Sequence, residues 1–332
     1  MPPRHSNLSR AAAGPRAFAI APARGEQYAG AAAALSRNQD LSTPRFSIVI
    51  PTYQRPEGLR NCLSGILALT APRDSFEVIV VDDGSAADPA YVVETFRGDL
   101  DLTLVRQPEN RGPASARNAG AARAVGDYLL FIDDDCIPTR DWLERLGSHL
   151  AGNPACAVGG ACRNSLTESL YSAAQQMLMD YLYEYYNGDA RHAGFCPTNN
   201  LAVPRQAFLE LGGFDTSFRY AAGEDREFSA RWTGRGAGLV FVHDTPVYHQ
   251  HVMGLRAFLR MHFHYGRGAR RFRRRQSADG VHRAFESGRF YWGLIVYPYR
   301  RTSAGKASAL CLAQLVSQAA HTAGYLREIL AD

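Results

Sequence analysis

Residues 127–135 read DYLLFIDDD, an apolar run that leads directly into three aspartates. An apolar run of this length predicts a strand that is buried on both faces, as in a parallel sheet. Three adjacent carboxylates repel one another, and a bound divalent cation relieves the repulsion. Hard oxygen ligands of this kind suit Mg²⁺ or Mn²⁺. The stretch therefore predicts a metal site at a strand end, and the alternative is a solvated acidic turn or a helix N-cap.

Similar apolar runs precede this one at residues 46–51, 76–81 and 102–105, with helical patterns at 60–69 and 114–124. Strands that alternate with helices predict an α/β fold with a mainly parallel, Rossmann-like sheet flanked by helices. Ligands bind such sheets beyond the carboxyl ends of the strands. Asp82 and Asp83 follow the second run, so they are expected near residues 133–135. Ordinary Asp-Gly turn chemistry explains them equally well.

The pattern changes after residue 150. The elements expected there are a helix over 165–187, a loop over 194–204, a turn and helix over 204–236, a strand over 239–242 and a long helix over 303–330. A histidine-rich segment and an arginine run at 267–275 lie between the last two. The run fits binding of phosphate, anionic lipid or nucleic acid, or a solvated face.

Two further groups carry candidate chemistry. Glu224 and Asp225 offer a general base, although acids at a helix start are common without catalysis. His249 and His251 alternate on a strand end and so share a face, and either is a candidate metal ligand. Their spacing does not choose between them.

Composition limits the remaining options. The 332 residues carry a formal net charge of +5, with 46% hydrophobic residues. No stretch has the roughly 18 uninterrupted apolar residues that a membrane span needs. The six cysteines form no Cys-x-x-Cys pair, which argues against a zinc site or a disulfide framework. We expect a cytoplasmic protein. The alternative is a protein that contacts the inner face of a membrane peripherally, through the apolar stretch 291–299 beside the arginines.

Six motifs in order resemble those of the family 2 glycosyltransferases with the GT-A fold. They are SIVIPTYQR (47–55), VIVVDDGS (78–85), NRGPASARNAG (110–120), FIDDD (131–135), LGGFD (211–215) followed by GED (223–225), and VYH (247–249). The resemblance covers roughly residues 46–265. FIDDD is similar to the family's DxD motif, and Asp225 matches its catalytic base.

The resemblance implies an inverting transferase that moves a sugar from a nucleoside-diphosphate sugar (UDP-, GDP- or dTDP-linked) to a hydroxyl acceptor, with Mn²⁺ or Mg²⁺ as cofactor and no nucleic-acid partner. The acceptor is a glycan, a lipid-linked compound or a small molecule. The implied metal ligands are Asp135, Asp133 and His249. The implied donor-binding residues are Pro51, Tyr53, Arg55, Asp82, Asp83, Asn110, Arg117, Asp133 and Asp134. The implied acceptor-binding residues are Asn200, Gly213, Phe214, Asp215 and Glu224.

The expected organisation has three parts. Residues 1–44 form a disordered leader or transit peptide, and residues 45–265 form the GT-A domain, with a nucleotide-sugar half (45–150) and an acceptor half (151–265). Residues 266–332 form a basic, helical C-terminal extension. No Gln-x-x-Arg-Trp motif occurs, which favours a non-processive enzyme.

Three alternatives compete with the transferase. A metal-dependent nucleotidyltransferase usually needs a lysine-bearing glycine-rich loop, whereas the single lysine here is Lys306. A nucleic-acid-binding protein leaves the three aspartates unexplained, and the sequence shows no interleaving of aromatic and basic residues of the sort that stacks bases. A non-catalytic nucleotide-sugar-binding protein has no need of the Glu224–Asp225 pair.

Overall fold

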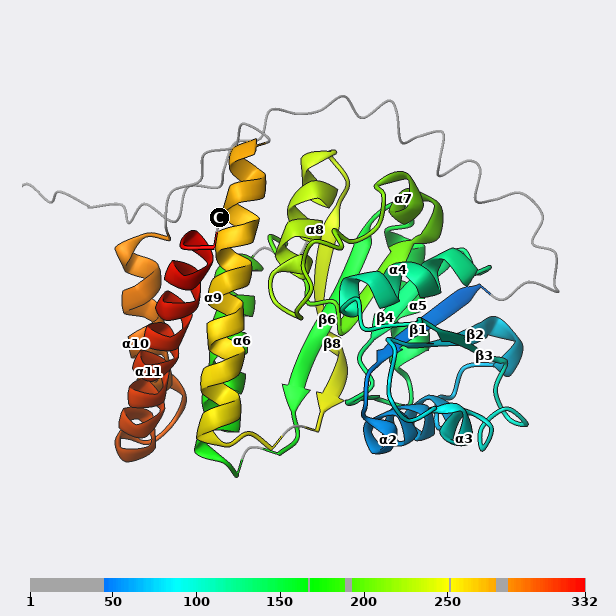
Figure 1. Cartoon of the computed structure of the whole chain (residues 1–332), viewed down its shortest axis with the longest axis horizontal. Coiled ribbons are helices and arrows are strands. Elements are labelled where there is room, and N and C mark those ends of the chain that lie inside the picture. The colour runs from blue at the N-terminus through cyan, green and yellow to red at the C-terminus, as the bar shows by residue number, and fades with distance from the viewer. Residues whose placement is uncertain (1–44, 167, 189–192, 251, 279–285, 332) are drawn as a thin grey trace, which may run out of the picture. The chain divides into compact units, whose positions relative to one another are not determined.

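The computed structural model describes residues 45–166, 168–188, 193–250, 252–278 and 286–331, so His251, the leader 1–44 and the end of the tail lie outside the described residues. Within this part the chain forms one eight-stranded sheet in the order β3-β2-β1-β4-β7-β6-β8-β5 (Figure 1). The strands are β1 Phe46–Thr52, β2 Phe76–Asp82, β3 Leu102–Arg106, β4 Tyr128–Ile132, β5 Cys136–Pro138, β6 Ala157–Asn164, β7 Asn200–Pro204 and β8 Leu239–His249.

The first four strands form the parallel half predicted from the alternating pattern. Beyond β4 the sheet is mixed, because β7 is antiparallel to both β4 and β6. β6 and β8 are again parallel, and the short β5 is antiparallel to β8. The α/β sheet is therefore confirmed, and it is mixed rather than doubly wound throughout.

Helices cover both faces of this sheet because neighbouring strand residues point to opposite sides. In β1, Ile48 and Ile50 face one core cluster and Val49 faces the other. The first cluster is closed by α2 Pro56–Leu67, α3 Ala90–Val93 and α5 Trp142–Gly152. The second is closed by α4 Pro113–Arg123, α7 Arg205–Glu210 and α8 Glu224–Gly234. A single 3₁₀ turn, Arg73–Ser75, leads into β2.

The C-terminal extension is helical, as expected. It contains α9 Leu255–Ala278, α10 Gly288–Arg301 and α11 Ala304–Ile329, which pack with α6 Leu170–Tyr186 beside the sheet domain (Figure 1). α9 continues through residue 265, where the sequence suggested a boundary. No helix among the described residues has the length and apolar character needed to span a bilayer.

Candidate active site

The polar ends of β1, β2 and β4 lie side by side because these strands are parallel neighbours. Thr52 ends β1 and is in register with Asp82 at the end of β2. The Thr52 hydroxyl donates a 2.7 Å hydrogen bond to Asp134, which follows β4. The three acidic residues after β4 therefore meet the first two strand ends at one edge of the sheet, as placement in the sequence predicted.

The middle aspartate of the triplet is buried. Asp134 has no exposed surface, and the Arg55 guanidinium lies 3.0 Å from its carboxylate. Burial raises the pKa of Asp134 to about 7, although Arg55 and the Thr52 hydrogen bond oppose the shift. This position differs from the direct donor contact expected from the sequence. Asp134 instead holds the turn after β1, in which Gln54 adopts a positive φ of 52°.

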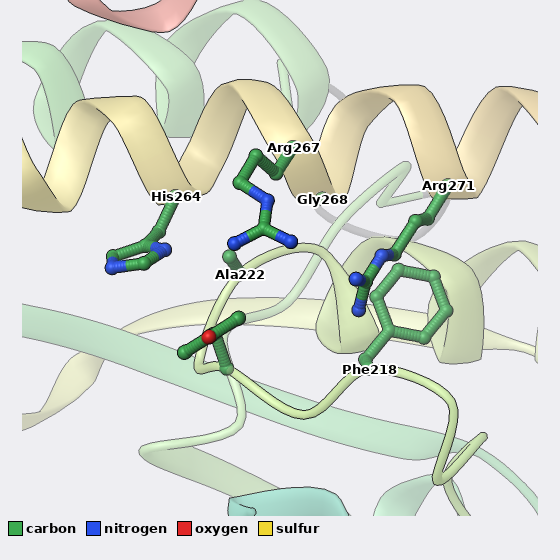
Figure 2. Close-up of a pocket in the computed structure, with 7 residues that line it drawn as sticks. Phe218, Ala222, His264, Arg267, Gly268 and Arg271 are labelled. Carbon is green, nitrogen blue, oxygen red and sulfur yellow. The ribbon is translucent and has the colours of Figure 1, made fainter. Parts of the chain in front are cut away.

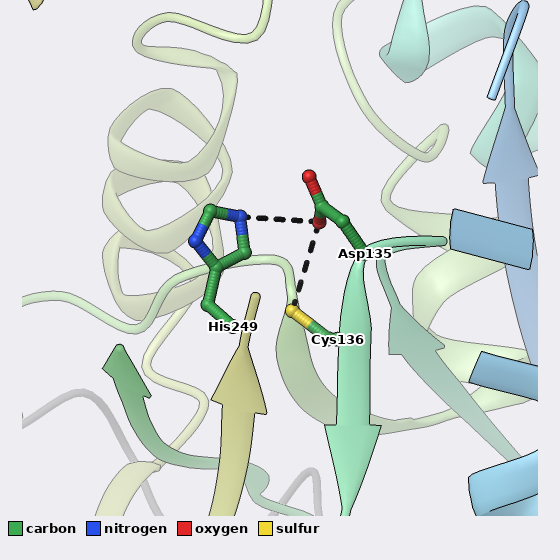
Figure 3. Close-up of side chains that lie close together, drawn as sticks. All are labelled: Asp135, Cys136 and His249. Atoms are coloured by element: carbon green, nitrogen blue, oxygen red, sulfur yellow. Dashed lines mark hydrogen bonds and ion pairs between the residues drawn. The ribbon is translucent and has the colours of Figure 1, made fainter. Parts of the chain in front are cut away.

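Asp135 faces His249 across the β5–β8 pairing, in which Cys136 is the register partner of His249. Figure 3 shows the Asp135 carboxylate between the imidazole, whose Nε2 lies 3.1 Å away, and the Cys136 sulfur at 3.9 Å. One ligand atom from each of the three residues lies within 4.8 Å of the others. Burial lowers the pKa of His249, but the hydrogen bond and charge of Asp135 outweigh it and raise the value to about 9.

The donor atoms at this point fit a hard divalent cation. The hydrogen bond with Cys162 and burial together raise the pKa of Cys136 well above its usual value. The carboxylate oxygen of Asp135 and the imidazole nitrogen of His249 are donor types that Mn²⁺ accepts. Arg55 also pairs with Asp135, so an arriving cation would compete with a guanidinium that is about half exposed.

Arg117 joins the two halves of the site. Its guanidinium is buried and lies 2.6 Å from Asp133, after β4, and 3.1 Å from Glu224, the first residue of α8. The family resemblance implies that Arg117 contacts the donor. In the structure it instead holds two carboxylates from segments more than ninety residues apart. A buried charge requires such partners, because an unpaired one is strongly destabilising.

Asp82 and Asp83 shape the neighbouring loops. Asp83 accepts 2.8 Å hydrogen bonds from the backbone N–H groups of Arg111 and Gly112. Asp82 accepts one from Ser85 and pairs with Arg106 at 3.0 Å. Both carboxylates are buried, so the turn interpretation accounts for the contacts in the structure. Gly112 has a φ of 89°, and a Cβ there would lie 2.5 Å from the Arg219 carbonyl oxygen, which brings the 110–112 loop against the segment before α8.

Among the other expected donor-side residues, Tyr53, Arg55 and Asn110 are exposed at this edge and Pro51 is buried in β1. Asp133 keeps about a quarter of its side chain exposed. Tyr53, Arg55, Asn110 and Asp133 therefore offer the accessible polar groups around the strand ends.

On the acceptor side, Asp225 is half-buried at the start of α8, next to buried Glu224. Burial, opposed by hydrogen bonds and by Arg226, raises the pKa of Asp225. Burial, the charge of Asp225 and the opposing charge of Arg117 leave the pKa of Glu224 at about 7. Gly223 precedes α8 as its N-cap and has a φ of 95°, which a residue with a side chain rarely adopts.

Several expected acceptor contacts are structural instead. The buried Asn200 amide binds Trp142, Ala161 and Thr245. Phe214 is buried against three aromatic rings. Gly213 has a φ of 68°, and a Cβ there would lie 2.5 Å from the side-chain oxygen of Asn118. Glu224 is buried on Arg117. Of these residues, only Asp215 keeps a partly exposed side chain. No pattern in the sequence indicates which of these positions are buried.

Two residues that the sequence did not single out also make contacts near the site. Thr52 binds Asp134, and Tyr220 stacks on His264 of α9 with ring centroids 4.3 Å apart. The arginine run was visible in the sequence, and the helical spacing of Arg267, Arg271 and Arg275 indicates that they share a face of α9.

The comparisons with known proteins agree with this geometry. Residues 47–212 match the family model described as glycosyl transferase family 2. Glycosyltransferase AglE of Haloferax volcanii is 29% identical over 60% of this chain and 65% of its own length. The pre-mycofactocin glycosyltransferase of Mycobacterium tuberculosis is 29% identical over 67% of this chain, which spans 46% of that protein. The chain thus spans less than two thirds of either relative.

Among solved structures, the mannosyltransferase PcManGT from Pyrobaculum calidifontis in complex with GDP-Man and Mn²⁺ superposes with a TM-score of 0.60. It is 20% identical, and the match covers 92% of this chain and 94% of PcManGT. The likeness confirms the GT-A fold with its C-terminal helices.

Proposed function

The chain belongs to glycosyl transferase family 2 and is a glycosyltransferase, and we propose that it moves a sugar from a nucleoside-diphosphate sugar to a hydroxyl acceptor by one inverting, metal-assisted displacement. The observation that carries this proposal is the bridge made by Arg117. It holds Asp133, beside the expected metal ligands, and Glu224, beside the expected base, on one buried guanidinium. Groups for the donor and for the acceptor thereby face one another.

Asp135, Asp133 and His249 would hold Mn²⁺ or Mg²⁺, which would neutralise the charge that develops on the diphosphate leaving group. On the protein side, Asp133 and Asp135 sit on a loop fixed by Asp134, Thr52 and Arg55. This fixation positions the carboxylates before the donor binds, so little reorganisation is needed during the reaction.

For the donor, we assign Tyr53, Arg55, Asn110 and Asp133 to contact and Asp82, Asp83 and Arg117 to positioning. Pro51 and Asp134 are buried beneath this edge of the sheet and support the residues that contact the donor. The donor base is open among uracil, guanine and thymine. The GDP-Man in the PcManGT structure makes the guanine nucleotide the first to test.

Asp225 is the proposed general base. Its carboxylate would take the proton from the acceptor hydroxyl as that oxygen attacks the anomeric carbon on the face opposite the diphosphate. The carbon–oxygen bond to the acceptor forms while the bond to the diphosphate breaks, so the anomeric configuration inverts. A raised pKa suits this role, because a base works best when its pKa approaches the operating pH.

We keep the division into a donor half (45–150) and an acceptor half (151–265) as a proposal, with α9 shared between the acceptor half and the extension. We also propose that the reaction is non-processive.

Membrane contact is proposed for α10 and α11, where Trp292 is 67% exposed and Leu312 is 63% exposed. Flotation with anionic liposomes tests this contact, and unchanged flotation of Trp292→Ser would remove the proposal.

The reaction itself can be tested without a known acceptor, because water is a hydroxyl nucleophile that can take the place of the acceptor. The full chain is incubated with UDP-, GDP- and dTDP-sugars and Mn²⁺, and the released nucleotide and the first-formed anomer are followed by NMR. We expect turnover of one donor with inversion, lost in Asp225→Asn. Release with retained configuration would contradict the single displacement, and no turnover and no binding of any donor would overturn the function.

A further inference from the structure

The helix α9 is strongly basic. Its 24 residues include eight arginines and no acidic residue, and six of the arginines lie between residues 267 and 275. Buried Glu328 of α11 pairs with two of them, Arg267 and Arg271. The pairing with Glu328 fixes the direction of these two side chains. The segment 215–222, which leads into α8, lies opposite this part of α9.

Two adjoining hollows form between α9 and this segment. Phe218, Tyr220 and Ala222 line the first from the loop, and His264, Arg267 and Arg271 line it from α9. Figure 2 shows the α9 side chains pointing from the helix toward the loop. The Arg267 guanidinium lies 5.2 Å from the centre of the Tyr220 ring, and Nδ1 of His264 is buried without a hydrogen-bond partner among the described residues.

The second hollow is larger, at about 230 Å³. It is lined by Asp215, Ser217, Phe218, Arg271, Arg274 and Arg275. Pockets for drug-sized ligands have about 300–1,000 Å³, so this space suits a small group better than a whole oligosaccharide. Arg271 donates a 3.0 Å hydrogen bond to the Ser217 carbonyl oxygen, and the exposed Arg275 lies 3.6 Å from Asp215. The second distance exceeds that of a good hydrogen bond, so Arg275 can turn to another anion.

The hollows lie close to the proposed base. A Cβ on Gly268 of α9 would lie 2.0 Å from the Ala222 carbonyl oxygen, and one on Gly223 would lie 3.3 Å from Gly268. α9 therefore touches the chain two or three residues before Asp225. Along the helix, Arg271 and Arg275 follow Gly268 by about 5 Å and about 10 Å, at roughly 1.5 Å per residue. An anion bound there is within the length of one or two sugar units of the contact.

We propose that this basic hollow binds a phosphate group of the acceptor, so that the acceptor is a phosphate ester and not a neutral glycan. Planar guanidinium groups pair with phosphate oxygens through two parallel hydrogen bonds, which favours phosphate over a neutral hydroxyl. Arg271 is held ready by Glu328 and Ser217, and Arg274 and Arg275 close the rim. The inference rests on the proposed function, because it takes Asp225 as the group that meets the acceptor hydroxyl.

The test measures phosphate binding with the donor site already filled. The full chain is saturated with a nucleoside diphosphate and Mn²⁺ and then titrated calorimetrically with inorganic phosphate, glycerol 3-phosphate and glycerol. The variant is Arg274→Gln with Arg275→Gln. The matched control is Arg256→Gln with Arg260→Gln, which removes two exposed arginines of the same helix outside both hollows.

We expect the phosphate ester to bind wild type and control with equal affinity. Its affinity for the Arg274/Arg275 variant should be lower by roughly tenfold or more, and glycerol should not bind. Equal binding by both variants, or binding of glycerol as tight as that of its phosphate, would overturn the inference. Vesicles of phosphatidylglycerol and of phosphatidylcholine separate the sources. Binding of the anionic vesicles alone, lost in the Arg274/Arg275 variant and kept in the control, assigns the phosphate to a lipid headgroup.

Failure of the proposed function looks different in the same experiment. If no nucleoside diphosphate binds in the first step, the donor site is wrong, whatever the titration with phosphate gives. If the nucleotide binds and phosphate does not, the transferase stands and the phosphate-bearing acceptor falls.

Discussion

Asp225 lies at the start of α8 with its carboxylate half-buried and its pKa raised. Replacing it with asparagine keeps the shape and removes the proton acceptor. We expect Asp225→Asn to lower kcat by about 10²–10⁴-fold, the usual contribution of a general base. Nucleotide affinity should stay within twofold of wild type. A variant that retains full turnover with normal donor binding would exclude Asp225 as the base.

The raised pKa also predicts the pH profile. The base works only when deprotonated, so activity is lost as pH falls through the pKa of Asp225. Because burial places that pKa above its ordinary value of 3.8, kcat/KM should fall at a pH higher than an exposed aspartate would give. Measurement of kcat/KM from about pH 3 to 9 checks this. An acid limb centred at the ordinary value would contradict the buried environment described for Asp225.

At the residue scale the sequence identified the acidic positions well but not their surroundings. Asp82, Asp83 and Asp134 are at the expected strand ends, yet all three carboxylates are buried and bind other groups of the protein. Whether a side chain at a strand end points outward or inward depends on segments far away in the chain. For Asp134 the deciding contact is Thr52, 82 residues earlier, and no local pattern contains that information.

The pair of helices α4 and α8 is held by Arg117. Replacing Arg117 with methionine leaves the buried Glu224 and the partly buried Asp133 without their cation. Removing one partner of a buried pair typically costs about 3–5 kcal/mol, so Arg117→Met should lower the free energy of unfolding by that amount. The double variant Arg117→Met with Glu224→Met should recover part of the loss. Urea denaturation of both variants measures their free energies of unfolding. Equal destabilisation of the single and the double variant would show that Arg117 and Glu224 are not coupled.

The crossing of α9 and α11 depends on two glycines. A Cβ on Gly324 would lie 1.9 Å from the Phe263 carbonyl oxygen, and one on Gly266 would lie 1.8 Å from that of His321. Gly324→Ala should therefore push the helices apart and cost about 1–3 kcal/mol. Gly305→Ala in the same helix is the control, because no atom lies within 4 Å of its Cβ. Similar melting temperatures for the two variants would argue against close packing at the crossing.

At the element scale, long periodic or strongly apolar segments were predicted within a few residues. The strands at 46–52 and 76–82 and the helix Ala304–Ile329 are examples. Strands β6 and β7 have no such signal, because they contain Gly159, Gly160 and Asn200 in place of an apolar run. Helix α9 looks like two segments in the sequence, one rich in histidine and one basic, because its composition changes along its length while its backbone stays helical. Pairing with β4 and β8 stabilises β6 and β7, and that pairing is a long-range property.

On the scale of the whole molecule, the donor-side strand ends and the acceptor half belong to one eight-stranded sheet, so ligand binding should stabilise the entire fold. A nucleoside diphosphate at a hundredfold excess over its Kd raises the free energy of unfolding by about 2.7 kcal/mol if it binds only the native state. If a cation held by Asp135 and His249 connects the protein to the diphosphate, most of this gain requires Mn²⁺.

We therefore expect the nucleotide-induced rise in melting temperature to disappear with EDTA and in Asp135→Ala, while the melting temperature without ligand changes little with EDTA. His249→Ala should weaken the dependence on Mn²⁺, shifting the required concentration upward. Asp244→Ala removes an exposed acid of the same strand that pairs with His149, so it should behave as wild type. A nucleotide shift that survives both EDTA and Asp135→Ala would mean that the donor binds without a cation at this site. The role of the three aspartates would then have to be electrostatic positioning of Arg55 and Arg117, the two cations that already touch them.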